Sequence, residues 1–160
     1  MSDRSYLVKV INERLISEFH RRGFSSVALT VEEKGTAVEE SFPFGRLRRK
    51  RGDEFDLVEV QLNNRKKNAF RVNFAVISEE GIDHVVGHVK AEDVWVHYLD
   101  HYCELYRSPT LLTWFSPRWT DFRSDANSKI LDAVTKAVGL LPEIDAFFLH
   151  RRKGRHVRCI

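Results

Sequence analysis

The sequence predicts an α+β fold in which a small antiparallel sheet of about four strands packs against an N-terminal and a C-terminal helix. Apolar residues recur at helical spacing near both ends of the chain, and two central segments alternate apolar and polar side chains as strands do. The length of 160 residues suits one domain, and no linker, repeat or low-complexity tract divides it. We therefore expect a single domain over residues 1–160, with a basic tail at 151–160.

The two main helices are predicted from their apolar stripes and their ends. The N-terminal helix carries apolar side chains that recur every four residues: Leu7, Ile11 and Leu15. It ends at Gly23, which supplies the left-handed exit that helices favour. A second helix is expected after Ser124, and Pro142 suits the first turn of a last short helix.

The central strands are predicted at 54–62 and 69–77, after an extended segment at 41–50 and a turn at 51–53. Successive strand side chains point to opposite faces. One face of this hairpin is apolar and forms the core: Val58, Val60, Leu62, Phe70, Val72, Phe74 and Val76. A shorter strand is expected at 27–31, and residues 94–107 fit either a helix or a strand.

The other face of the predicted hairpin carries four polar side chains: Glu59, Gln61, Arg71 and Asn73. A carboxylate, two amides and a guanidinium can bind a polar ligand or an anion. We therefore treat this quartet as a candidate ligand-binding site. The alternative is a solvated sheet face with a cross-strand ion pair, which is ordinary for an antiparallel sheet.

The cysteines and the hydropathy of the chain suggest where in the cell the protein is located. Only Cys103 and Cys159 are present and they lie far apart in the sequence, so we expect two free thiols and a cytoplasmic protein. The first residues lack a secretory pattern, and no apolar run is long enough for a membrane helix, so no membrane association is expected. The formal net charge is +3, but the last ten residues hold five cations, so the body is nearly neutral.

Two basic segments support an alternative function, nucleic-acid binding. Their cations are Arg46, Arg48, Arg49, Lys50 and Arg51 in the predicted sheet, and Arg151, Arg152, Lys153 and Arg155 in the tail. Phosphate groups bind such clusters, but a charged edge strand and a solvated chain end explain them equally well. Nucleic acid is therefore an alternative partner, which the sequence does not favour over a protein.

Metal-dependent hydrolysis is a second alternative. His97 and His101 would share one face if their segment were helical, and two such histidines can contribute to a zinc site. Asp53 or Asp56, followed by Glu59-x-Gln61, faintly resembles the acidic core of restriction-type nucleases, in which carboxylates hold a divalent metal. The sequence has no Gly-x-Ser-x-Gly elbow, glycine-rich phosphate loop or dinucleotide fingerprint. It therefore indicates no catalytic residue and no cofactor.

A non-enzymatic interaction module is the favoured interpretation. Segment 111–122 is rich in aromatic residues, and interfaces are enriched in such side chains. The candidate partner-binding residues are Trp114, Phe115 and Trp119. An accessory protein of this kind could neutralise a toxin or assist another protein partner.

The central hairpin also resembles a known family. Segments 48–51, 58–61 and 70–74, with the Gly23–Phe24 step, resemble the bacterial family of domains of unknown function numbered 4304. The resemblance covers roughly the first half of the chain. It implies an α+β fold and a bacterial origin, and it implies no activity.

Overall fold

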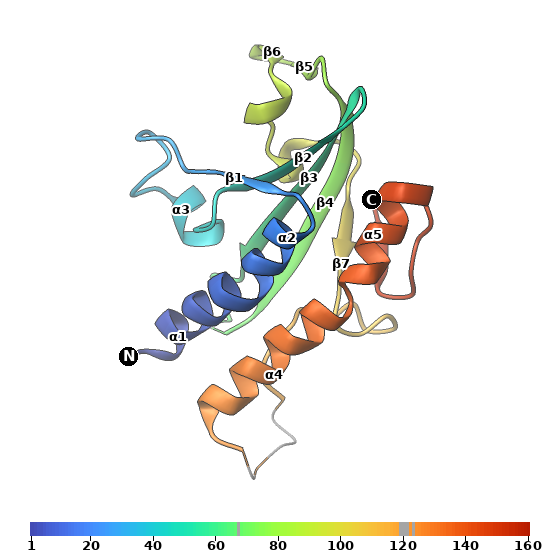
Figure 1. Cartoon of the computed structure of the whole chain (residues 1–160). Coiled ribbons are helices and arrows are strands. Elements are labelled where there is room, and N and C mark those ends of the chain that lie inside the picture. Colours follow the sequence, from blue (N-terminus) through green and yellow to red (C-terminus); the bar gives the residue numbers. More distant parts are fainter. Residues whose placement is uncertain (67, 119–121, 123) are drawn as a thin grey trace.

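The computed structural model describes residues 1–66, 68–118, 122 and 124–160 (Figure 1). A six-stranded sheet occupies its centre, with the strand order β1-β2-β3-β4-β7-β8 and antiparallel pairing throughout. Its strands are β1 (Ser25–Val27), β2 (Arg46–Arg51), β3 (Glu54–Leu62), β4 (Phe70–Ser78), β7 (Cys103–Leu105) and β8 (Val157–Cys159). A separate hairpin, β5 (Ile82–His84) and β6 (Gly87–Val89), extends beyond one end of the sheet. The predicted α+β class is confirmed.

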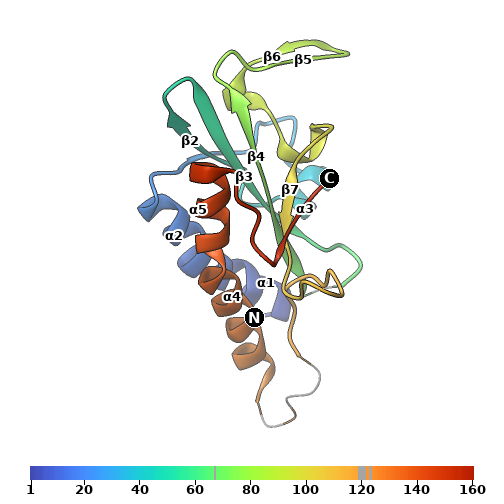
Figure 2. The ribbon, with the colours of Figure 1, turned by 90° about the vertical axis from the view of Figure 1, so that its right-hand side faces the viewer.

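Helices from both ends of the chain cover one face of the sheet (Figures 1 and 2). The N-terminal helix runs through α1 (Asp3–Val10), widens to π-helical turns in η1 (Ile11–Ile16) and ends in α2 (Ser17–Arg21). Beside it lies α4 (Ala126–Gly139), followed by α5 (Leu141–His150) with Pro142 in its first turn. The three predicted helices are therefore present.

The main core lies between these helices and the sheet. Leu7, Ile11 and Leu15 are fully buried, as are the apolar residues of α4 that face the sheet. The strands contribute the side chains that alternation assigned to the core, including Val58, Val60, Leu62, Phe70, Val72 and Phe74. Burial of these apolar surfaces is the main term that stabilises the fold.

Shorter elements cover part of the opposite face of the sheet. They are α3 (Ala37–Ser41) and two 3-10 turns, η2 (Ala91–Asp93) and η3 (Val96–Tyr98). Figure 2 shows α3 on the far side of the sheet from the long helices. A second, smaller apolar cluster forms here from Leu57, Ala75, Ile77, Ala91, Val94 and Val96. This covering encloses the polar side chains of the central strands.

Two sequence expectations for local structure are wrong. Residues 94–107 form neither a single helix nor a single strand, because Trp95 and Leu99 have extended backbones on either side of η3. The strand expected at 27–31 ends at Val27, and Val31 lies exposed in the following turn. Around η3, the packing of Val94 and Val96 against Leu57, Ala75 and Ile77 of the sheet overrides the local preference.

The expectation of two free thiols is also wrong. Cys103 and Cys159 lie directly opposite each other on β7 and β8 and form a disulfide. The chain returns from α5 to add β8 beside β7, and this return brings together residues that are 56 positions apart. The cysteines therefore give no reason to expect a cytoplasmic protein. Within the described residues, no helix has the length and apolar character needed to cross a membrane.

Candidate functional site

A row of polar side chains crosses the sheet on the face opposite the long helices. Register places Glu59, Asn73, Glu104 and Arg158 directly opposite one another on β3, β4, β7 and β8. The first three are buried, whereas Arg158 lies exposed at the edge. We call these four residues the polar row. Buried carboxylates require hydrogen-bonding partners, so the contacts of this row determine what it can do.

The Glu59 carboxylate holds the covering segment against the sheet. It accepts hydrogen bonds from the main-chain amides of Val96 and His97, at 3.0 and 3.1 Å. Its Oε1 lies 2.9 Å from His97 Nδ1 and 3.0 Å from the Asn73 side-chain nitrogen. Internal contacts thus satisfy the hydrogen-bonding capacity of this buried carboxylate.

The second buried carboxylate, Glu104, has different partners. It lies 2.7 Å from Arg71 Nη1 and accepts a hydrogen bond from the Tyr106 hydroxyl. Burial raises the pKa of Tyr106, and the hydrogen bond to Glu104 adds to this effect. Arg71 also donates to Gln61 at 3.1 Å, and its guanidinium lies 4.5 Å from the centre of the Trp114 ring. This cation–π contact connects the sheet face to the loop that follows β7.

The structure therefore brings together the four residues of the predicted ligand-binding quartet. Glu59 and Asn73 are 1% and 0% exposed, whereas Gln61 and Arg71 are half-buried. Asn73 Oδ1 has no hydrogen-bond partner among the described residues. The cavities beside α4 and beside the disulfide are lined by other residues. Ligand binding by the quartet stays a prediction, and the contacts in the structure indicate a network that joins three strands and their covering segment.

A carboxylate outside the sheet completes this covering. Glu33 accepts hydrogen bonds from Trp95 Nε1 at 3.0 Å and from Arg46 Nη1 at 3.1 Å. Burial acts to raise the pKa of Glu33, but hydrogen bonds from Thr30 and Trp95 and the charge of Arg46 outweigh burial and lower it. The Phe42 ring stacks on the His97 imidazole, with centroids 4.2 Å apart. Residues on both sides of α3 are thereby held against Trp95 and His97 at η3.

The basic strand β2 uses its cations for internal contacts. Arg48 is buried and donates from Nη2 to the Val94 carbonyl at 3.1 Å, while its Nε and Nη1 have no partner among the described residues. Burial lowers the pKa of Arg48 to about 10, and the nearby charge of Arg46 acts in the same direction. Arg46 is also buried and pairs with Glu33. These two guanidinium groups do not face solvent.

The remaining cations of β2 are paired with acids. Arg49 Nη2 lies 2.8 Å from the buried Asp56 carboxylate, and Arg51 Nη2 lies 2.7 Å from it. Lys50 pairs with Glu79 at 2.8 Å. The arrangement does not favour the prediction that 46–51 is a phosphate-binding strand.

The residues of the predicted metal sites are separated. His97 binds Glu59, while His101 Nδ1 lies 3.3 Å from the Ile160 carbonyl, and no helix joins the two histidines. Asp56 points to the helix face of β3 and Glu59 to the opposite face, because the two positions differ by an odd number. Within the described residues, no group of three His, Cys, Asp or Glu side chains could hold a metal ion.

The aromatic-rich stretch divides into buried and exposed parts. Phe115 is fully buried, stacks on Phe70 and exchanges two main-chain hydrogen bonds of 2.9 Å with it, so its prediction as a partner-binding residue is corrected. Trp114 is half-buried beside Arg71, and Trp119 lies outside the described residues. Leu111 and Phe122, in contrast, are 76% and 89% exposed.

Two cavities lie between residues of the 107–118 segment and α4. One of about 550 Å³ is lined by Lys66, Ser116, Arg118 and Lys129, among other residues. The other, of about 430 Å³, is lined by Arg107, Arg118, Asp132 and Lys136. We call the two cavities, which share Arg118, the basic groove. The spacing of Lys129 and Lys136 places them on one face of a helix, but the sequence could not show that a loop lies beside that face.

The basic tail is only partly free. Arg151 donates to the Phe148 carbonyl at 2.6 Å, which caps α5, and it pairs with Glu54 at 2.9 Å. Arg152, Lys153 and Arg155 are exposed.

No protein-family model, no curated protein and no solved structure matches this chain. The resemblance to the bacterial family of domains of unknown function therefore stays a prediction.

Proposed function

We propose that this protein is a non-enzymatic interaction module that binds a protein partner through residues 107–118, which we call the contact loop. The main support is that Leu111 is 76% exposed in the turn between Ser108 and Thr113 and that Leu112 beside it is 36% exposed. These leucines belong to a loop whose ends, Arg107 and Arg118, line the basic groove, and an exposed apolar patch with a polar rim is a feature of protein-binding surfaces.

The contact loop is held in one shape by its own hydrogen bonds. Ser108 and Thr113 form a β-bridge, and the Arg107 amide donates to the Thr113 carbonyl at 2.9 Å. Arg107 also donates through its guanidinium to the Ser116 carbonyl. The buried Phe115 anchors the far end of the loop on β4. A preorganised loop loses less conformational entropy when a partner binds.

The surroundings of the loop suggest the chemistry of the partner. The basic groove beside it contains the cations Lys66, Arg107, Arg118, Lys129 and Lys136. Among the described residues that line it, Asp132 is the one acid, and it lies 3.2 Å from Arg107. A partner with an apolar pocket and an acidic rim would complement this surface, because opposite potentials guide association and orientation. We expect a toxin that the module neutralises, or another protein that it assists, to present this complementary surface.

A comparative pull-down tests the proposal. The wild-type protein, the variant Leu111→Asp/Leu112→Asp and the control variant Val85→Asp are used to capture proteins from a bacterial lysate that is divided into nuclease-treated and untreated halves. Val85 is a suitable control because it is 95% exposed at the tip of the β5–β6 hairpin. A partner that the wild type and the control retain, and that the double variant loses, supports the proposal.

The captured partner is then purified for direct titration. We expect the double variant to raise the dissociation constant at least about tenfold, which corresponds to roughly 1.4 kcal/mol of binding free energy. Lys136→Glu should raise the dissociation constant less and should make binding less dependent on salt concentration. Equal binding by all three proteins would overturn the proposal, as would loss of every partner after nuclease treatment, which would favour nucleic acid.

A further inference from the structure

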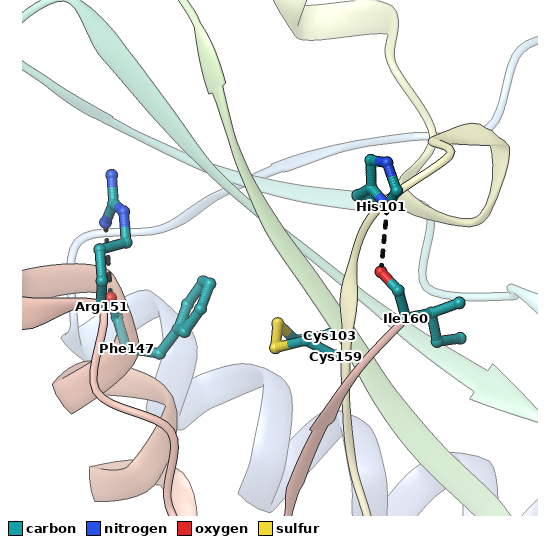
Figure 3. Close-up of a disulfide and its surroundings, with 6 residues drawn as sticks. All are labelled: His101, Cys103, Phe147, Arg151, Cys159 and Ile160. Carbon is teal, nitrogen blue, oxygen red and sulfur yellow. Dashed lines mark hydrogen bonds between the residues drawn. A yellow bond between two sulfur atoms is a disulfide. The ribbon is translucent and has the colours of Figure 1, made fainter.

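A cavity of about 250 Å³ lies beside the disulfide, where the end of α5 approaches β4, β7 and β8. Both Cys103 and Cys159 line it. Figure 3 shows the disulfide with Phe147 of α5 and Arg151, the C-cap of that helix, on one side. His101 and Ile160 lie on the other side. The sulfur atoms thus border a space that a small molecule can enter.

The two cysteines differ in their access to solvent. Cys103 is 3% exposed and belongs to the main core, because β7 lies between β4 and β8. Cys159 is half-buried on β8, which is the edge strand of the sheet. Thiol–disulfide exchange requires a thiolate to reach one sulfur of the bond, so access selects which sulfur is attacked. Here it selects Cys159.

The rim of the cavity is basic. Arg151 and Lys153 line it and are both exposed, and His101 lies on the opposite side. Glu54 neutralises part of the charge of Arg151, at 2.9 Å, but Glu54 does not line the cavity. Positive charge at the entrance raises the local concentration of anions and disfavours cations.

We propose that Cys103–Cys159 is a thiol-exchange site for a low-molecular-weight thiol that carries carboxylate groups. The thiolate sulfur of the ligand attacks Cys159 Sγ, and the bond between Cys159 and Cys103 breaks as the new sulfur–sulfur bond forms. The electron pair leaves on Cys103, which takes a proton from solvent and becomes a thiol. Cys159 then carries the ligand as a mixed disulfide. A second ligand thiolate can release Cys159, and the two ligand thiols are then oxidised to their disulfide.

The protein can keep its fold after this exchange because β8 has other attachments. The Tyr106 amide donates to the His156 carbonyl at 2.9 Å, and the Ile160 amide donates to the Tyr102 carbonyl at 2.9 Å. The His156 imidazole lies 2.7 Å from Glu143 of α5. The site and its modification are independent of the proposed protein-binding function.

Mass spectrometry of the folded protein tests the site. The protein is incubated with reduced glutathione, which is anionic, or with cysteamine, which is cationic, and free thiols are then blocked with iodoacetamide. We expect glutathione on Cys159 and the alkyl group on Cys103. We also expect glutathione to react about tenfold faster than cysteamine at low salt, after correction for the rates of both thiols with an unstructured peptide disulfide.

Charge-reversal variants test the role of the cavity rim. Lys153→Glu should remove most of the preference for glutathione, whereas Lys34→Glu, an exposed lysine in the turn before α3, should leave it unchanged. Near-ultraviolet circular dichroism verifies that the protein stays folded during the reaction. The proposal is overturned by a disulfide that resists both thiols in the folded protein, by an adduct on Cys103, or by equal corrected rates for the two thiols.

Discussion

Glu59 Oε1 in β3 lies 2.9 Å from Nδ1 of His97, a residue 38 positions later in the sequence. The same carboxylate accepts hydrogen bonds from two main-chain amides of the covering segment and from Asn73. One buried side chain thereby joins the sheet to the segment that encloses its second face. The residue that the sequence pattern assigned to ligand binding has at least this structural role.

Removing this carboxylate should destabilise the protein strongly. Glu59→Ala leaves the amides of Val96 and His97 without a partner in a buried environment, so we expect the free energy of unfolding to fall by about 3 kcal/mol. Gln61→Ala, at the half-buried edge of the same strand face, should cost only about 1 kcal/mol. Urea unfolding curves for both variants measure the difference, and equal losses would contradict this role for Glu59.

Replacing a buried cation should stabilise the protein. Arg48 has two guanidinium nitrogens without a partner among the described residues, and burial lowers its pKa to about 10, so the folded state disfavours its charge. Arg48→Met should therefore raise the free energy of unfolding by about 1 kcal/mol, as replacement of buried charges by apolar residues often does.

The neighbouring Arg46 provides the matched control. It is buried to the same degree but pairs with Glu33 at 3.1 Å. Arg46→Met leaves that carboxylate without its cation and should lower the free energy of unfolding. Chemical denaturation distinguishes the variants, and a loss of stability in both would show that Arg48 has stabilising contacts in solution.

The contribution of Glu33 should depend on pH. Its pKa in the folded protein is lower than the ordinary value of 4.5, so its ionised form favours folding. This stabilisation is complete above pH 4.5 and is lost as the pH falls through the folded pKa. Wild type should therefore exceed Glu33→Gln in unfolding free energy at pH 7, and the gap should narrow at about pH 3.5. Denaturation at both pH values measures the gap, and a constant gap would refute the assignment.

Asp56 should matter for stability because it is the buried partner of two arginines. Asp56→Ala leaves Arg49 and Arg51 without their carboxylate, and we expect a loss of about 3 kcal/mol. Asp53→Ala, at an exposed turn position two residues from β2, should change stability by less than about 0.5 kcal/mol. Thermal unfolding ranks the two variants, and a small effect of Asp56→Ala would show that these ion pairs do not form in solution.

Local pattern was sufficient for the central hairpin. Glu59, Gln61, Arg71 and Asn73 share one face of the hairpin, as the alternation of the two strands predicted, and the structure adds the register that pairs Glu59 with Asn73 and Gln61 with Arg71. The sequence patterns did not single out Glu104, although the alternation of Cys103, Glu104 and Leu105 is typical of a strand. A strand of three residues is too short for its pattern to distinguish it from a turn.

The sequence by itself determined the elements whose signals are local: the helices at both ends, the central hairpin and the face to which each of its side chains points. These follow from backbone geometry, because side-chain direction repeats every 3.6 residues in a helix and every two in a strand. Only the tertiary structure decided which polar groups are buried. Segments at 33–42 and 91–99 cover the second face, and β8 returns beside β7, so Arg46 and Arg48 lie inside and Cys103 meets Cys159. Exposure is a property of what packs on a surface, and the covering segments are distant in the chain.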